Sequence, residues 1–207
     1  MDYPFLDYTF YQLMATGVIA ACASVTASSV PCAFSAAVNA IASVHYYLTR
    51  QALQTGADSA FETAVQLRYS DWAVTLPLMG IELHLLAEKL DPGYSPSFYP
   101  KELSAFALLC VVTLGAIWSF SKRRIIGFLC FAASCILMGS VLLNLLSNID
   151  ADRDLFLLFT LPWIGYPVVS IAEATLFRAS PGFIAGLYAV LDLWSKAGLA
   201  LAVSMRA

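Results

Sequence analysis

Five charged side chains lie within long apolar stretches of this sequence: Arg68, Asp71, Glu82, Asp192 and Lys196. At the centre of a membrane-spanning helix, an aspartate, lysine or arginine costs about 2.5–3.5 kcal/mol on insertion scales. Charges that are kept at such positions are therefore candidates for function. The other charged residues lie at the ends of the predicted helices or in the connections between them.

Two kinds of chemistry fit this lysine and its carboxylates. Asp192 and Lys196 are four residues apart and share one helix face, as do Arg68 and Asp71, which are three apart. The first interpretation is structural, with ion pairs that join two helices. The second is a Schiff base on Lys196, because a protonated Schiff base is positive and needs nearby negative charge in a low dielectric. The spacing leaves both interpretations open, and also a transporter that uses these charges without a chromophore.

The composition indicates an integral membrane protein. Hydrophobic residues make up 60% of the 207 positions and charged residues only 12%, which is about half the usual share. The mean hydropathy of +0.75 agrees. A net charge of −3 supplies no basic surface for nucleic acid, so that partner is excluded. The five cysteines form no CxxC pair and the two histidines add no ligand spacing, so neither a metal site nor a disulfide framework is expected.

The apolar stretches predict an all-α fold, a seven-transmembrane-helix bundle in which residues 1–207 form a single domain. A spanning helix needs about 20 mostly apolar residues. Pro31, the Asp91–Pro100 segment and the basic turn at Lys122 separate such stretches, because proline, glycine and clustered charge favour connections. The predicted helices cover residues 6–27, 32–50, 63–86, 102–121, 125–149, 155–176 and 181–205, with Ser180 opening the last.

Three segments resemble the microbial rhodopsins, in the order in which that family carries them. Residues 68–79 read RYSDWAVTLPLM and are similar to its RYxDWxxTxPL signature. Residues 163–168 read WIGYPV, like its WxxYPV segment, and residues 191–196 read LDLWSK, like its LDxxxK segment. The resemblance covers the whole chain and implies a retinal-binding membrane protein rather than an enzyme.

The resemblance implies a cofactor and its counterions. Lys196 would carry all-trans-retinal as a Schiff base, with Asp71 as primary counterion and proton acceptor and Asp192 as second counterion. The expected lining of the retinal pocket consists of large or apolar side chains: Trp72, Met79, Trp163, Tyr166 and Pro167. Ser170 departs from the family pattern, because a tryptophan or tyrosine commonly packs beside the retinal ring there.

Asp71, Thr75 and Glu82 form a triplet similar to that of outward proton pumps of the proteorhodopsin and xanthorhodopsin type. Glu82 would be the proton donor, because burial in an apolar site favours a protonated carboxyl group. His45 looks like the histidine that partners the acceptor aspartate in such pumps. The alternative is a photosensor that signals through a transducer, which usually lacks a carboxyl donor.

The remaining expectations concern the surroundings of the site. Arg68 belongs to the charge environment of Asp71, Glu173 is the only candidate on the proton-release side, and His84 receives no role. Gly127 is expected to be a helix-packing glycine rather than the window for a carotenoid antenna. The partners expected are the lipid bilayer and protons, and a homo-oligomer is compatible with the family.

The resemblance implies a multi-pass protein of the cell (inner) membrane with an extracellular N-terminus. The basic residues, five on the N-terminal side including Arg178 and four on the other, lean weakly toward a cytoplasmic N-terminus. One charge of bias decides little, so the orientation implied by the resemblance is preferred.

Overall fold

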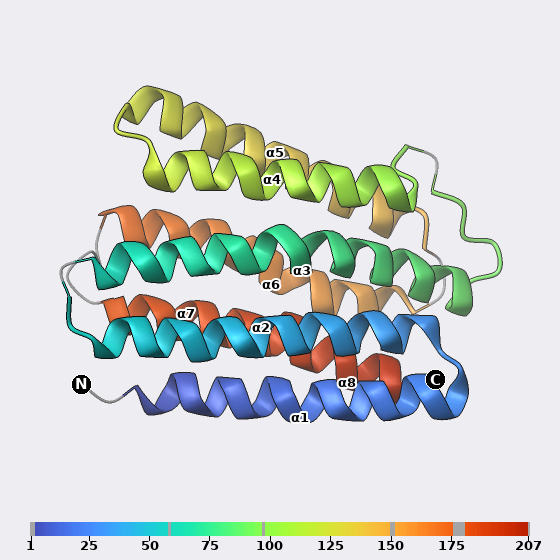
Figure 1. Ribbon diagram of the computed structural model, residues 1–207. Helices are drawn as coiled ribbons and strands as arrows, with labels where there is room; N and C mark the ends of the chain where they lie inside the picture. Colours follow the sequence, from blue (N-terminus) through green and yellow to red (C-terminus); the bar gives the residue numbers. More distant parts are fainter. Residues whose placement is uncertain (1–2, 58, 97, 150–151, 176–180, 207) are drawn as a thin grey trace. The chain divides into compact units, whose positions relative to one another are not determined.

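The computed structural model describes residues 3–57, 59–96, 98–149, 152–175 and 181–206, and this part of the chain contains helices and no strand (Figure 1). Seven helical runs follow one another, as predicted. They are α1 (Pro4–Ala27), α2 (Val30–Gln54), α3 (Ala60–Leu90), α4 (Lys101–Phe120), α5 (Arg124–Ser147), α6 (Arg153–Thr175) and α7 (Pro181–Asp192), the last continuing through η1 (Leu193–Gly198) into α8 (Leu199–Ser204).

The helix ends follow local chemistry. Proline lies in the first turn of α1 and of α2, where its missing N–H breaks no helical hydrogen bond. Ser28 ends α1 in the left-handed conformation, with φ of 50°, and its N–H donates to the Ser24 carbonyl. α2 begins at Val30, so Pro31 lies within it, whereas the predicted helix began two residues later, at residue 32. Ser180, Arg178 and residue 176 of the predicted sixth helix lie outside the described residues.

Five of the helical runs in the described part of the chain are long and apolar enough to cross a membrane: α1, α4, α5, α6 and the run from Gly182 to Ser204. The other two, α2 and α3, are also long but carry polar residues named above: His45 on α2, and Arg68, Asp71 and Glu82 on α3. On α5, Ile125, Ile136 and Leu143 are between 69% and 78% exposed. Such outward apolar side chains suit contact with lipid, since they would be costly in water.

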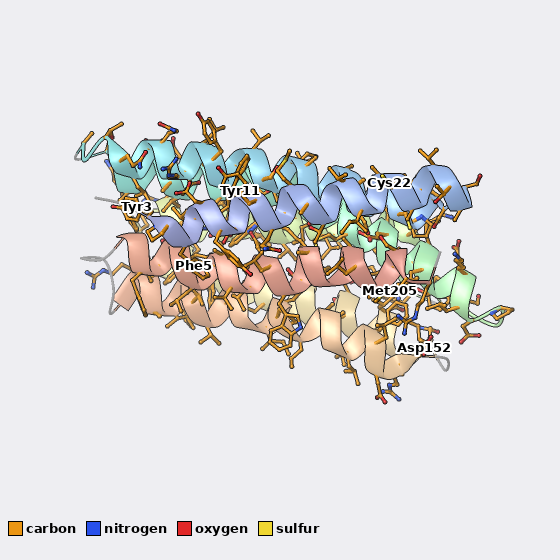
Figure 2. The ribbon with its side chains drawn as sticks, turned by 90° about the horizontal axis from the view of Figure 1, so that it is seen from below. Tyr3, Phe5, Tyr11, Cys22, Asp152 and Met205 are labelled. Atoms are coloured by element: carbon orange, nitrogen blue, oxygen red, sulfur yellow. The ribbon has the colours of Figure 1, made fainter. Side chains whose placement is uncertain are left out.

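The chain divides into two compact units. The first comprises residues 1–71 and 159–207. Within it α1 and α2 lie side by side, and the backbone at Gly17 approaches so closely that an added Cβ would be 3.3 Å from Asn39 Cβ (Figure 1). Tyr3 lies where α7 begins, because a Cβ at Gly182 would meet its ring at 2.5 Å (Figure 2). The core of this unit includes Leu13 and Ala189, both completely buried.

The second unit comprises residues 72–158, and α4 and α5 lie side by side in it (Figure 1). Gly127 packs against α4: an added Cβ would lie 3.4 Å from the Trp118 ring and 3.5 Å from Ser121. Ser134 ties the two helices together, because its hydroxyl donates to the Val111 carbonyl at 3.0 Å. Gly127 thus has the packing contacts that were expected of it.

Candidate functional site

Lys196 lies on a short π-helical stretch, η1, that interrupts the last helical run. Ser195, Lys196 and Ala197 are all buried there. A π-helical turn is rare, because it widens the helix by one residue per turn, and it often marks a functional position. The sequence carries no recognisable signal for it: the stretch reads LWSKAG, with no proline and with glycine only at its end.

The amine of Lys196 lies between two buried carboxylates. Its Nζ is 2.6 Å from Asp71 Oδ2 on α3 and 3.2 Å from Asp192 Oδ2, four residues earlier on the same run. The three side chains are only 2–3% exposed. A charge buried to this extent is strongly unfavourable without an opposite charge beside it, so the three groups depend on one another. The structure therefore brings together the three residues that the sequence placed at the centre of the site.

Asp192 is held by hydroxyl groups from two other helices. Tyr46 on α2 donates to its Oδ2 at 2.8 Å, and Tyr166 on α6 donates to its Oδ1. The Tyr166 hydroxyl also lies 3.0 Å from Ser195 Oγ. These contacts fix the orientation of the carboxylate. Tyr166 was expected only as pocket lining, and Tyr46 and Ser195 were not foreseen at all.

His45 lies near Asp71 but is not hydrogen-bonded to it. Its Nδ1 is 3.9 Å from Asp71 Oδ1, beyond hydrogen-bonding range. That nitrogen is instead 2.9 Å from the Ile41 carbonyl, which can only accept, so Nδ1 carries a hydrogen. Nε2 contacts Ser70 Oγ at 3.1 Å. The sequence predicted that His45 partners the acceptor aspartate, and the structure places the two side chains near each other without a direct hydrogen bond.

Arg68 is paired with Glu173 on α6. One guanidinium nitrogen of Arg68 lies 2.9 and 3.1 Å from the two carboxylate oxygens of Glu173. The guanidinium also lies over the ring of Tyr188 on α7, 3.7 Å from its centre, and the Tyr188 hydroxyl donates to Glu173 at 3.1 Å. Arg68 was expected in the environment of Asp71, and it does line the same small cavity as Asp71, but its ion-pair partner is the carboxylate of Glu173.

A cavity of about 20 Å³ is lined by Arg68 of this pair and by Asp71 and Asp192 of the lysine site. Its polar lining comes from His45, Tyr46, Thr49, Arg68, Asp71, Tyr188 and Asp192. A space of this size holds about one water molecule, and a water there would have several polar partners. The cavity can therefore hold a water molecule next to Asp71, and such a water could carry a proton.

We expect Glu173→Gln to lower the free energy of unfolding by about 3 kcal/mol, because it leaves the Arg68 charge buried without its counterion. The measurement is reversible unfolding of the purified protein in mixed detergent micelles. Glu88→Gln is the matched control: Glu88 pairs with Lys101 at 3.5 Å, but both side chains are 38–45% exposed. Such exposed pairs contribute at most about 1 kcal/mol. Equal losses in the two variants would contradict a structural role for the buried pair.

The remaining predicted residues lie on α3 beyond Asp71 and on α6. Thr75, Met79 and Glu82, in the second unit, are at most 1% exposed, and Trp72 is half-buried. Pro167 lies inside α6. Trp163 is 1% exposed, and its indole N–H has no hydrogen-bond partner among the residues that the structure describes.

These residues fit a retinal Schiff base. Lys196 supplies a buried amine, and Asp71 and Asp192 supply the negative charge that a protonated Schiff base requires. The ring of Trp163, which is 1% exposed, supplies a large aromatic face of the kind that packs against a flat conjugated chain. The helices and this lysine define the class: a helical membrane protein with a buried lysine suited to carry retinal.

Comparison with known proteins gives the family. Residues 5–206 match the model of the bacteriorhodopsin-like proteins, so the chain belongs to that family, the microbial rhodopsins, whose members bind retinal. No curated protein matches the chain.

Solved structures agree on the fold. The light-driven proton pump rhodopsin CsR of Coccomyxa subellipsoidea is similar with a TM-score of 0.75 and 19% identity, over 99% of this chain and 96% of that one. Xanthorhodopsin, a light-driven ion pump with a dual chromophore, gives 0.72 and 20%, over 98% and 90%. Bromide-bound halorhodopsin from Halobacterium salinarum gives 0.70 and 18%, over 98% and 93%. The chain is thus a multi-pass membrane protein with the seven-helix fold of the microbial rhodopsins.

Proposed function

We propose that this protein is a light-driven outward proton pump that carries all-trans-retinal on Lys196. The observation that carries the proposal is the buried contact between Lys196 Nζ and Asp71, at 2.6 Å. A carboxylate at this distance can both balance a positive charge and accept a proton. An anion pump would be expected to avoid a fixed negative charge there, because it would repel the transported ion.

When bound to Lys196, retinal supplies light absorption and an isomerisation that changes the proton affinity of the lysine nitrogen. Lys196 Nζ then passes its proton to Asp71 Oδ2 along the existing contact. The hydroxyl groups of Tyr46 and Tyr166 donate to the Asp192 carboxylate and stabilise its negative charge. The two carboxylates thereby take different roles, with Asp71 as acceptor and Asp192 as lasting counterion.

Glu82 is the proposed donor that returns a proton to Lys196. Its side chain is 1% exposed, and a carboxyl group so deeply buried favours its neutral, proton-carrying form. With an extracellular N-terminus, Asp71 faces the outside and Glu82 the cytoplasm, so each cycle moves one proton outward across the cell (inner) membrane. In this proposal the proton leaves past the pair of Arg68 and Glu173, because Arg68 lines the same cavity as Asp71.

We expect Glu82→Gln to slow the return of the proton to Lys196 by about 100-fold, the factor typical of a lost general acid. The measurement is flash-induced absorption change of the retinal-loaded protein, followed through the late photocycle. Glu88→Gln, on the same helix but exposed, should leave the late photocycle unchanged. An unaltered late photocycle in Glu82→Gln would remove Glu82 as donor.

A further inference from the structure

His84, two residues after Glu82 on α3, lies in a buried hydrogen-bond network that the pumping mechanism does not use. Its ring is 2% exposed. Nδ1 lies 2.5 Å from the Tyr94 hydroxyl, and Nε2 lies 2.8 Å from Ser104 Oγ at the start of α4. Ser104 Oγ in turn donates to the Tyr99 carbonyl at 3.1 Å. All four residues belong to the second unit.

The network assigns the hydrogen positions. The Ser104 hydroxyl has one hydrogen and gives it to a carbonyl, so it must accept from His84, whose Nε2 therefore carries a hydrogen. In a neutral imidazole the other nitrogen is then an acceptor, and the Tyr94 hydroxyl donates to it. A neutral His84 thus satisfies every group in the network, and the ring connects α3, α4 and the chain between them.

Tyr94 reaches His84 because the chain turns back directly after α3. The sequence Asp91-Pro92-Gly93-Tyr94 forms a turn in which the Tyr94 N–H donates to the Asp91 carbonyl at 2.9 Å. The Asp91 side chain accepts from the Gly93 N–H at 2.9 Å and stiffens the turn. As a result Tyr94, although it lies in a connection, is only 8% exposed.

The contact lies between Glu82 and the aqueous end of α3. Two residues advance an α-helix by about 3 Å, so His84 lies one step nearer than Glu82 to the half-exposed pair of Glu88 and Lys101. Around it Leu83, Leu86 and Ala87 are at most 2% exposed. A water that approaches Glu82 from this end of α3 therefore has to pass the level of the His84–Tyr94 bond.

We propose that the hydrogen bond between Tyr94 and His84 is a latch that closes this end of α3 and keeps water from Glu82 in the dark. His84 is then a positioning residue for proton uptake, and the inference rests on the proposed role of Glu82 as donor. Breaking the hydrogen bond between Tyr94 and His84 would admit the water from which Glu82 regains its proton. Forming it again would prevent a proton leak between cycles.

The test uses Tyr94→Phe, which removes one hydroxyl and keeps the ring, in the full retinal-loaded protein. The matched control is Tyr99→Phe, because the Tyr99 hydroxyl, in the same connection, contacts Ser140 Oγ on α5 instead of His84. The first readout is the rate at which the Glu82 carboxyl band shifts after transfer to D2O in the dark, by infrared spectroscopy. The second is amide hydrogen exchange of the Asp91–Tyr94 turn, by mass spectrometry.

We expect Tyr94→Phe to speed both exchange rates by about tenfold, the factor that corresponds to the loss of one hydrogen bond of ordinary net strength. Tyr99→Phe should leave the carboxyl exchange at the wild-type rate. Wild-type rates in Tyr94→Phe, or equal acceleration in both variants, would overturn the latch. If instead the late photocycle of Glu82→Gln is unaltered, the donor assignment fails, and the amide exchange of the turn still decides whether the hydrogen bond between Tyr94 and His84 holds the turn closed.

Discussion

Replacing Lys196 with alanine is expected to abolish the visible absorption band that forms when retinal is added to the protein. Alanine has no amine, so no covalent bond to the aldehyde can form, and Asp71 and Asp192 lose the cation that they share. Lys196→Arg separates the two effects, because it keeps the positive charge but cannot form a Schiff base with retinal. Both variants should lack the band, and the arginine variant should retain more of its stability against unfolding.

The control for this prediction is Lys122→Ala, in the exposed connection between α4 and α5, which should form the band at the wild-type amplitude. The measurement is an absorption spectrum before and after addition of all-trans-retinal to purified apoprotein. A band of wild-type amplitude in Lys196→Ala would show that the chromophore is bound elsewhere or not covalently.

Replacing Asp71 with asparagine is expected to reduce light-driven proton transport by at least about a hundredfold. The amide cannot accept the proton that leaves Lys196 Nζ, so the first transfer loses its acceptor. It also leaves Asp192 as the one carboxylate within 4 Å of the amine among the described residues, which should move the absorption maximum to longer wavelength. Transport is measured as the light-induced pH change in vesicles, and the spectrum in the same sample.

Asp154→Asn, an exposed substitution at the start of α6, is the control and should leave both measurements unchanged. Undiminished transport in Asp71→Asn would show that another group accepts the proton. Asp192 would then be the nearest alternative acceptor, since its carboxylate lies 3.2 Å from Lys196 Nζ.

The centre of the site could be predicted from sequence because the residues carry their own signal. A lysine and an aspartate four residues apart in an apolar helix are too costly to be incidental, and the motif around Asp71 points to the same chemistry. The structure places Lys196 Nζ 2.6 Å from Asp71 Oδ2 and 3.2 Å from Asp192 Oδ2. The number of helices was predictable for a similar reason, since a bilayer sets the length of an apolar run.

The partners of these residues were not predictable. Whether Arg68 turns toward Asp71 or Glu173 depends on how α6 and α7 are rotated about their axes. In helices that are apolar on nearly every face, hydrophobic periodicity does not predict this rotation. The π-helical stretch at Lys196 contains no residue pattern that distinguishes it from an ordinary helix. The contact between His84 and Tyr94 arises from a turn, and its sequence signal, Asp-Pro-Gly, indicated a connection without showing which helix the chain folds back on.

The central claim, outward proton transport, is tested most directly by the pH of an unbuffered suspension of cells that express the retinal-loaded protein. Illumination is expected to acidify the medium, and a protonophore should abolish the change. Acidification that also disappears in Asp71→Asn would support proton transfer from Lys196 to Asp71 as the first step of transport. Alkalinisation of the medium would contradict outward pumping, and the absence of any pH change in a protein with a normal visible band would favour a photosensor.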